Sequence, residues 1–517
     1  MTKLAAASRR SLLLGAGASV ASAFMPHTGH ATMPELTTVA QNAINPHGSQ
    51  RFMAACMQQN MVDAVVIDHV NDTLNSRMLC LAPSGCSISD IVLAYPGWSM
   101  TGGKETNWPT SYTVTAAIEY PEGQFTPVFR NRSRSLTVPP GPSQAEFDPC
   151  PVSIPSGARF FVKTCARWTR GAFPLSSFTA VNRKAGESST DATGDADLTL
   201  VPGQASPQFS DVAGFGPSVY GRLGAPSVVL GVLGDSIARA WGDCGDPALN
   251  AMFIRRAMRN AFPVLEMNMP GDNLDHYLQR NNGRQEMAQK HITHLLVQLG
   301  HNDLPFFPAE KVALALQAVL APFLAAGVIC YAGTAVPVST SRDQWVTRDG
   351  QTTVAWNANR LRYNHWLRGG WQSIGLSGIF DFAGAVESQA ASYWNVDDTS
   401  SGYGAGGYPT LRNGEVAEAV IGLRAGNRYP PNGTALPCVV VNQPGDTTGA
   451  GAIVHATSNR SGAITGFVVE RGGHNYTLPP LISALGAWTP DGVHPSKRAY
   501  DQMIAATGLG PTRFVLR

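Results

Sequence analysis

Charge is scarce in this 517-residue sequence, since only 14% of its residues are Asp, Glu, Lys or Arg and about 25% is typical of a globular domain. The formal net charge is +2. Lys3, Arg9 and Arg10 supply three positive charges within residues 1–31, which contain no Asp or Glu, so a chain without that segment carries −1. This near-neutral balance lacks the excess of positive charge that attracts nucleic acid. With 44% hydrophobic residues, we expect a globular protein rather than a disordered one.

Long apolar runs are also missing. The 13 small or apolar residues from Leu12 to Phe24 fall short of the roughly 20 that a membrane span needs. They follow Ser8-Arg9-Arg10-Ser11, which resembles a twin-arginine export motif, and precede two possible cleavage sites, Ala21-Ser22-Ala23 and Gly29-His30-Ala31. We therefore predict that residues 1–31 are a signal peptide and that the mature protein is periplasmic or extracellular, without a membrane span. A retained amphipathic helix is the alternative.

The eight cysteines form no CxxC pair and no metal-binding spacing. In an exported protein disulfides are allowed, and the candidate local pairs are Cys80 with Cys86 and Cys150 with Cys165. Cys330 lies in an apolar run and is expected to be a buried thiol. The spacing does not determine a connectivity.

Several common sites are lacking as well. The sequence has no G-x-S-x-G elbow, no P-loop and no dinucleotide fingerprint, so we expect no cofactor. His291 and His294 suit a zinc site only if a third ligand joins them, and a structural pair is the preferred interpretation. Asp191, Asp195 and Asp197 suggest either a calcium loop or, preferably, a solvated acidic loop.

Residues 60–220 have the pattern of β structure. Residues 91–95, 112–120 and 159–163 are short runs rich in β-branched or aromatic residues, separated by Pro and Gly turns. No helical pattern lies between them, which favours an antiparallel β-sandwich.

From Ser227 onward, strands and helices alternate. The apolar run Val228–Leu233 suits a strand that is buried on both faces. The expected elements that follow are strands at 264–269, 294–299, 328–332 and 378–381 and helices at about 246–261, 308–326, 356–371 and 496–507. This alternation predicts βαβ units and a parallel sheet, that is, an α/β fold.

Between about 400 and 485 the α/β pattern stops, and residues 451–457 and 462–470 have the character of strands. This segment weakly resembles glycine-rich β modules of surface and phage-tail proteins. The predicted organisation is a signal peptide (1–31), an N-terminal β-rich domain (32–225), an α/β domain in two parts (226–400 and 486–517) and a small inserted β module (401–485).

Two motifs suggest nucleophilic catalysis. Gly234-Asp235-Ser236 follows the first buried strand, at the end of the sheet where sites form. Asp491-Gly492-Val493-His494 places a carboxylate three residues before a histidine, so that Asp491 can accept the Nδ1 proton while Nε2 takes the Ser236 proton. Each motif by itself is also ordinary turn or helix-cap chemistry.

Two further motifs follow the next strands. Pro270-Gly271-Asp272-Asn273 presents a glycine N–H, and Gly300-His301-Asn302-Asp303 presents a side-chain amide. Together with the Ser236 N–H they would supply three donors to an oxyanion hole made of Ser236, Gly271 and Asn302.

The four motifs in this order resemble the conserved blocks of SGNH (GDSL-type) hydrolases, over about 226–390 and 486–517. The resemblance implies a three-layer α/β/α fold, Ser236 as nucleophile and first oxyanion donor, Gly271 and Asn302 as further donors, and His494 as base. Ile237 stands where Leu is commoner in the family, and the long insertion before Asp491 is unusual.

We therefore predict a secreted serine esterase that acts through an acyl-enzyme with Ser236, His494 and Asp491, and without a metal. The favoured substrate is the O-acetyl group of a carbohydrate, because broad β faces suit sugars. The alternatives are a lipase or arylesterase of the same family and an inactive surface protein that binds glycans. The expected partner is an ester substrate such as an acylated polysaccharide, and the expected state is a monomer.

Overall fold

The computed structural model describes residues 52–59, 64–66, 72–101, 104–168, 173–175, 182, 185–192, 196–203, 215–249, 252–279, 282–388, 392–397 and 400–516. All of them belong to one unit, Ala43–Arg517. The predicted signal peptide, residues 1–31, lies outside the described residues.

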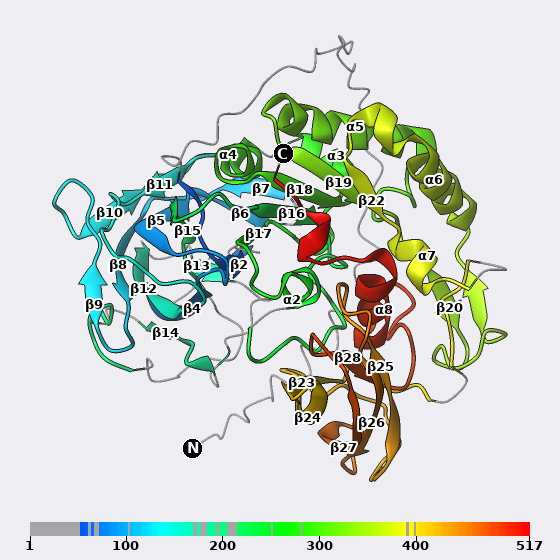
Figure 1. Cartoon of the computed structure of the whole chain (residues 1–517). Coiled ribbons are helices and arrows are strands. Elements are labelled where there is room, and N and C mark those ends of the chain that lie inside the picture. The colour runs from blue at the N-terminus through cyan, green and yellow to red at the C-terminus, as the bar shows by residue number, and fades with distance from the viewer. Residues whose placement is uncertain are drawn as a thin grey trace, which may run out of the picture. The chain divides into compact units, whose positions relative to one another are not determined.

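A six-stranded sheet in which every neighbouring pair is parallel forms the centre of the α/β domain (Figure 1). Its order is β2 (Met57–Gln59), β17 (Val264–Glu266), β16 (Leu230–Gly234), β18 (His294–Gln298), β19 (Ile329–Gly333) and β22 (Gly378–Phe380). The predicted α/β class with a parallel sheet is confirmed. The edge strand β2 was not predicted, and it comes from far upstream of the other five.

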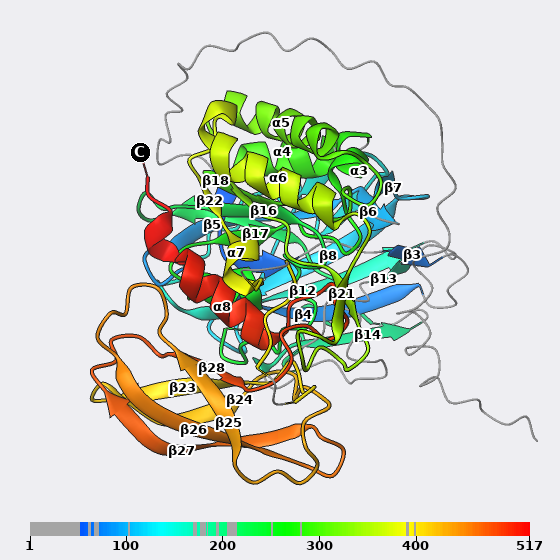
Figure 2. The same ribbon diagram turned by 90° about the vertical axis from the view of Figure 1, so that its right-hand side faces the viewer.

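Helices cover both faces of this sheet (Figure 2). One face carries α3 (Leu274–Gln279), α4 (Asn282–His291), α5 (Ala309–Ala325) and α6 (Asn357–Gly370), and the other carries α2 (Phe253–Met258), α7 (Phe382–Val386) and α8 (Lys497–Thr507). Side chains along 229–233 alternate between the two cores: Val229 and Leu233 face one, Leu230 and Val232 the other. This two-sided burial explains the continuous apolar run.

The expected helix at 246–261 is much shorter than predicted, since α2 spans only Phe253–Met258. Residues before it are held by carboxylates instead: Asp246 accepts the Ala248 N–H at 2.8 Å, and Asp243 accepts the Phe253 N–H at 2.8 Å. The helix ends because Arg259 adopts the left-handed conformation, with φ of 51°.

The N-terminal β region, residues 52–223, contains two larger antiparallel sheets. One is ordered β1 (Met53–Ala54), β15 (Ser218–Leu223), β5 (Ile88–Pro96) and β11 (Gln144–Glu146). The other is ordered β10 (Ser135–Val138), β8 (Tyr112–Glu119), β12 (Arg159–Trp168), β4 (Thr73–Leu81) and β14 (Ser188–Ala192), and β9 (Phe125–Pro127) pairs with β8. Both sheets contribute to one apolar core. The strands predicted at 91–95, 112–120 and 159–163 are confirmed.

Three small two-stranded antiparallel sheets complete the described strands of these parts. They are β6 (Trp98–Thr101) with β7 (Lys104–Asn107), β3 (Ala64–Val66) with β13 (Phe173–Leu175), and β20 (Ser339–Ser341) with β21 (Gln351–Thr353). The short 3₁₀ helices are η2 (Trp371–Ile374) and η3 (Pro511–Arg513).

The inserted β region, residues 401–485, forms a further antiparallel sheet between α7 and α8 in the chain. Its order is β24 (Glu415–Ile421), β23 (Gly406–Arg412), β28 (Leu481–Ala484), β25 (Leu436–Val441), β26 (Ala450–Ser458) and β27 (Ile464–His474). The strands expected at 451–457 and 462–470 are present. Two small apolar clusters lie within this region.

Neither candidate disulfide is present among the described residues, in which all eight cysteines are thiols. Cys80 lies on β4, where its thiol interacts with that of Cys56 rather than with Cys86. Cys165 lies on β12, whereas the backbone of Cys150 forms an isolated antiparallel β-bridge with Ile91 of β5. Cys330 is a buried thiol, as predicted.

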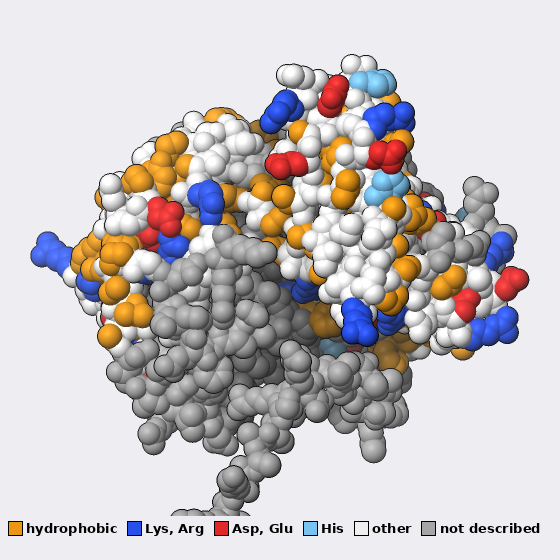
Figure 3. Space-filling model, turned by 90° about the horizontal axis from the view of Figure 1, so that it is seen from below, with side chains coloured by type: hydrophobic (Ala, Val, Ile, Leu, Met, Phe, Trp, Pro, Cys, Tyr) orange, Lys and Arg blue, Asp and Glu red, His pale blue; other side chains and the backbone are white. Residues whose placement is uncertain are grey.

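Charges of both signs mix on the surface. Among the described residues on the face that Figure 3 shows, Lys and Arg side chains lie scattered between Asp and Glu. In the described parts of the chain, no helix has the length and apolar character that crossing a membrane requires.

Candidate active site

The candidate site lies beside β16, where the order in which the chain adds strands to the parallel sheet reverses. The chain leaves β16 for β17 on one side and, through α3 and α4, reaches β18 on the other side. Ligand sites of open α/β sheets form at such points, beyond the carboxyl ends of the strands. The loops that follow β16, β17 and β18 carry Ser236, Gly271 and Asn302 respectively, so the nucleophile candidate sits between the other two.

Ser236 begins a tight turn after β16. Gly234 is required there, because a Cβ would lie 2.3 Å from the Ala238 Cβ. The buried Asp235 accepts the Ile237 N–H at 2.8 Å, and its backbone oxygen accepts the Arg239 N–H at 2.9 Å. From α8, the Tyr500 hydroxyl donates to the Ile237 carbonyl at 3.0 Å. These bonds fix the turn and leave the serine side chain partly exposed.

The structure brings Ser236, His494 and Asp491 together in one hydrogen-bonded row. The His494 Nε2 lies 2.8 Å from the Ser236 Oγ, and its Nδ1 lies 2.7 Å from the Asp491 Oδ2. The second carboxylate oxygen of Asp491 accepts the backbone N–H groups of Val493 and His494, both at 2.9 Å. With the proton on Nδ1, His494 donates to Asp491, and its Nε2 accepts from the serine hydroxyl.

The loop that carries Asp491 and His494 is anchored from a distant part of the domain. The Gly492 carbonyl accepts the Trp394 indole N–H at 2.9 Å and the Ser339 N–H at 3.1 Å. The indole of Trp394 is fully buried. The histidine is therefore presented on a fixed support rather than on an unsupported loop.

The electrostatic surroundings keep charge on Asp491. Partial burial raises the pKa of Asp491, but the hydrogen bond from His494 and two backbone N–H bonds outweigh it and hold that pKa below its usual value. Burial raises the pKa of Asp235 to about 7. Burial and the charge of His494 lower the pKa of His301 to about 3, so His301 is neutral at pH 7.

The two remaining oxyanion candidates lie on facing loops. Gly271 is exposed and has φ of 78°, a conformation that favours glycine. A Cβ on it would meet no atom within 4 Å, so its backbone borders open space. The Asn302 Nδ2 donates to the Asp272 carbonyl at 2.9 Å, which ties its loop to the Gly271 loop. An amide nitrogen carries two hydrogens, so this bond engages one of them.

Sequence reasoning missed the role of Asp303. Its buried carboxylate accepts the N–H groups of Leu274 at 2.9 Å and Asp275 at 3.1 Å, at the start of α3. Asp303 thus joins the loop after β18 to the helix that follows Gly271. The Gly300–Asp303 motif contained this residue, but only its asparagine had an evident chemical use.

The two histidines of the zinc alternative have separate partners. His291 stacks on Tyr220 with ring centroids 3.6 Å apart, and the ring nitrogens of His294 lie 2.7 Å from the Thr293 Oγ1 and 3.1 Å from the Val515 carbonyl. Asp197 accepts from Thr199 and Thr115. Asp195 and the side chain of Asp191 lie outside the described residues.

An exposed tryptophan stands beside the histidine. Trp241 ends the Ser236 turn, where its N–H donates to the Ser236 carbonyl at 3.0 Å. Its ring centroid lies 5.8 Å from that of His494, and 43% of the residue is exposed. A broad aromatic surface therefore borders the row of hydrogen bonds.

No family model matches this chain, and no curated protein matches it. Many of the solved structures that resemble part of the chain are GDSL/SGNH acylhydrolases and esterases. A GDSL-like lipase from Bacteroides thetaiotaomicron is 10% identical, with 32% of this chain and 74% of that chain covered and a TM-score of 0.25. For a mutant acetyl-xylooligosaccharide esterase from Geobacillus Stearmophilus the values are 12%, 31%, 77% and 0.24. For the protein YxiM from Bacillus subtilis they are 14%, 65%, 75% and 0.24.

The chemistry of the site is therefore inferred from the contacts of Ser236, His494, Asp491 and Asn302 alone.

Proposed function

We propose that this chain is a serine esterase of the SGNH type that hydrolyses carboxylic esters through an acyl-enzyme. The observation that supports the proposal best is the continuous row from Ser236 Oγ through His494 to Asp491, with hydrogen-bond distances of 2.8 and 2.7 Å. Nucleophile, base and orienting carboxylate are the parts that acyl transfer from a serine requires.

In the proposed reaction, the Ser236 oxygen attacks the ester carbonyl carbon while His494 Nε2 takes the serine proton. The tetrahedral intermediate collapses when His494 gives that proton to the leaving alcohol and the carbon–oxygen bond breaks. Water then attacks the acyl-enzyme, His494 takes its proton, and the proton returns to Ser236 as the acid leaves. Asp491 remains ionised and stabilises the imidazolium.

The negative charge on the intermediate's oxygen needs donors. The proposed hole consists of the N–H groups of Ser236 and Gly271 and the second Nδ2 hydrogen of Asn302. The bond from Asn302 to the Asp272 carbonyl supports this assignment, because it holds the amide against the Gly271 loop before any substrate arrives.

Kinetics of the Ser236→Ala and Asn302→Ala variants with p-nitrophenyl acetate test this proposal. We expect Ser236→Ala to abolish turnover, and Asn302→Ala to lower kcat by roughly 10²–10³. Undiminished activity of Ser236→Ala would sink the nucleophile assignment, and a loss well below tenfold in Asn302→Ala would remove that amide from the hole.

For the substrate, we propose O-acetyl groups on a carbohydrate rather than a triglyceride or a simple aryl ester. The exposed indole of Trp241 beside His494 supports this choice, because flat apolar rings suit the faces of sugar rings. Acetate release from acetylated xylan, compared with acyl release from triglycerides, decides between a carbohydrate ester and a lipid ester as substrate.

Trp241→Ala sharpens that comparison. We expect KM for acetylated xylo-oligosaccharides to rise roughly tenfold, equivalent to about 1.4 kcal/mol, while turnover of p-nitrophenyl acetate stays nearly unchanged. An equal loss with both esters would show that Trp241 supports His494 instead of binding the sugar. The inactive glycan-binding alternative would be favoured by a different result. In that case the parent protein binds the glycan but shows no esterase activity, and Trp241→Ala loses the binding.

The proposal includes export through residues 1–31, a monomeric mature protein and the domain division at 225, 400 and 485. N-terminal sequencing of the exported protein and its mass in solution test the first two. Autonomous folding of residues 401–485 would test the boundaries at 400 and 485.

A further inference from the structure

A carboxylate of the N-terminal β region reaches into the α/β domain. Glu105, on β7, lies 178 positions before Gly283 in the first turn of α4, yet its Oε2 accepts the Gly283 N–H at 2.9 Å. Its Oε1 accepts the Arg284 N–H at 3.0 Å and the Arg284 Nε–H at 3.1 Å. A carboxylate at the first turn of a helix satisfies N–H groups that have no partner within the helix.

Arg284 carries this contact onward to the loop that follows β17. Its Nη1 donates to the Asp272 Oδ2 at 2.5 Å and to the Met267 carbonyl at 3.3 Å. The guanidinium carbon also lies 5.0 Å above the Tyr277 ring. Arg284 is almost fully buried, with 1% of its surface exposed.

Asp272 completes the path to the oxyanion candidates. It directly follows Gly271, and its backbone carbonyl accepts the Asn302 Nδ2–H at 2.9 Å. The carboxylate held by Arg284 and the carbonyl held by Asn302 therefore belong to the same residue. A shift of Asp272 would move both the Gly271 N–H and the Asn302 amide.

Stability alone does not account for these three buried charges. Removing ions from water costs several kcal/mol for each, and well-packed apolar residues often stabilise a core as well or better. Burial raises the pKa of both Glu105 and Asp272, and the charge of Arg284 offsets part of that rise, so that both pKa values stay above their usual range. What such a network supplies is fixed geometry, because each group has few arrangements that satisfy all its hydrogen bonds.

We propose that Glu105 and Arg284 are positioning residues of the esterase site, so that the N-terminal β region is part of the catalytic unit. This inference rests on the proposed function. Glu105 orients Arg284, Arg284 fixes Asp272, and Asp272 sets the places of the Gly271 N–H and the Asn302 amide. None of these steps requires the N-terminal region to touch the substrate.

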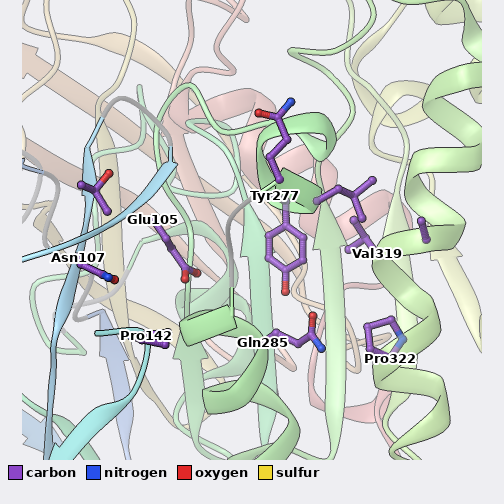
Figure 4. A pocket seen from close by; sticks show the side chains of 11 residues that line it. Glu105, Asn107, Pro142, Tyr277, Gln285, Val319 and Pro322 are labelled. Atoms are coloured by element: carbon purple, nitrogen blue, oxygen red, sulfur yellow. The ribbon is translucent and has the colours of Figure 1, made fainter. Parts of the chain in front are cut away.

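Glu105 also lines a pocket of about 560 Å³ between β7, α3, α4 and α5. Figure 4 shows Tyr277 between Glu105 and Val319, with Gln285 below it. The pocket is open to solvent, and Glu105 forms part of its wall. A small carboxylate in solution can therefore enter the space that a Glu105→Ala variant leaves.

Kinetics of Glu105→Gln and Glu105→Ala with p-nitrophenyl acetate test the inference. We expect kcat to fall about 10–100-fold in both, because misplacement by about 1 Å costs that much, while KM changes little since the donors act on the transition state. We expect formate at tens of millimolar to restore part of kcat in Glu105→Ala and none in Glu105→Gln, where the amide fills the space.

Glu119→Gln is the matched control. Glu119 is also a buried carboxylate of the N-terminal β region, bonded to Arg77 at 2.7 Å, but its hydrogen-bond partners, Arg77 and the Gly123 N–H, lie within that region. The Glu119→Gln variant should therefore be destabilised to a similar extent as Glu105→Gln, but its kcat should be unchanged. Equal losses of kcat in Glu105→Gln and Glu119→Gln would overturn the inference, as would an unchanged kcat in Glu105→Gln.

Should Glu105→Gln fail to fold, Glu105→Asp carries the test: a normal kcat despite the retracted carboxylate would contradict the positioning role, and a lowered kcat at unchanged KM would support it. Failure of the proposed function is seen separately. In that case Ser236→Ala remains active. If Ser236→Ala is inactive while Glu105→Gln is fully active, only the positioning role of Glu105 is refuted.

Discussion

The N-terminal β region and the inserted β region are both antiparallel, but they relate to the parallel sheet differently. Met53, Trp98 and Tyr220 of the N-terminal region belong to the same buried cluster as Leu265 and Leu295 of the sheet. The strand β2 even extends that sheet as its edge. In the inserted region, every buried apolar residue except Leu481 belongs to one of two small clusters that lie within this region.

The contacts of the inserted region with the α/β domain include several polar ones besides the packing of Leu481. Ser483 donates to Asp501 of α8, and the Tyr408 hydroxyl lies 3.3 Å from the Cys244 thiol. Lys497 of α8 is paired with Asp501 and reaches the Ile482 carbonyl. Small cores and polar contacts are typical of appended units, whereas a shared apolar core makes two regions fold as one. The difference implies that only the N-terminal region is integral to the site.

Truncating one buried aromatic residue in each region gives the largest contrast. Trp98 packs so closely on α4 that a Cβ on Gly283 would lie 2.3 Å from its indole nitrogen. Trp98→Ala should cost about 3–5 kcal/mol and remove most esterase activity, because the shared core is lost. Tyr429→Ala, in the core of the inserted region, should unfold that region while activity persists. Denaturant unfolding with parallel esterase assays makes the comparison, and equal loss of activity in both variants would refute it.

A smaller effect should come from Asp446, which supports a loop of the inserted region. It accepts the N–H groups of Thr448, Gly449, Thr477 and Leu478. Although burial opposes it, these bonds lower the pKa of Asp446 to about 2. Asp446→Ala should cost about 1–3 kcal/mol of stability in this region.

The pH dependence of that cost follows from the lowered pKa. A carboxylate whose pKa is lowered on folding stabilises the protein above its ordinary pKa, about 3.8, and this stabilisation disappears as the pH falls through about 2. The difference in thermal midpoint between the parent protein and Asp446→Asn should therefore be constant from pH 5 to 7 and shrink between pH 4 and 2. A difference that grows on acidification would contradict the assignment.

The smallest effect on activity is expected from excision of residues 403–485. The two ends are already adjacent, since the Ala487 N–H donates to the Gly402 carbonyl at 2.8 Å. Joining Gly402 to Gly486 should leave kcat/KM for p-nitrophenyl acetate within roughly threefold, as expected for an appended unit. A folded but inactive product would show that the inserted region also positions the site.

Much of the α/β architecture could be predicted from local sequence. The apolar run before Ser236, the motifs after β16, β17 and β18, and the Asp491–His494 spacing are all short-range signals. They placed the candidate residues on adjoining loops, and the structure brings Ser236, His494 and Asp491 within hydrogen-bond distance.

What local sequence could not provide are the long-range partners. Met57-Gln58-Gln59 has no apolar run to mark it as the edge strand β2, and Glu105 lies 178 positions from its partner Gly283. Residues 246–261 have helical character, yet Pro247 and the carboxylates of Asp243 and Asp246 hold the first part as turns. Such outcomes depend on groups that meet only after folding.

Labelling with a fluorophosphonate probe followed by peptide mapping tests the central claim most directly. The account predicts one adduct, on the peptide that contains Ser236, with none in Ser236→Ala and much slower labelling in His494→Ala. An adduct on a different residue, or undiminished labelling of Ser236→Ala, would contradict it.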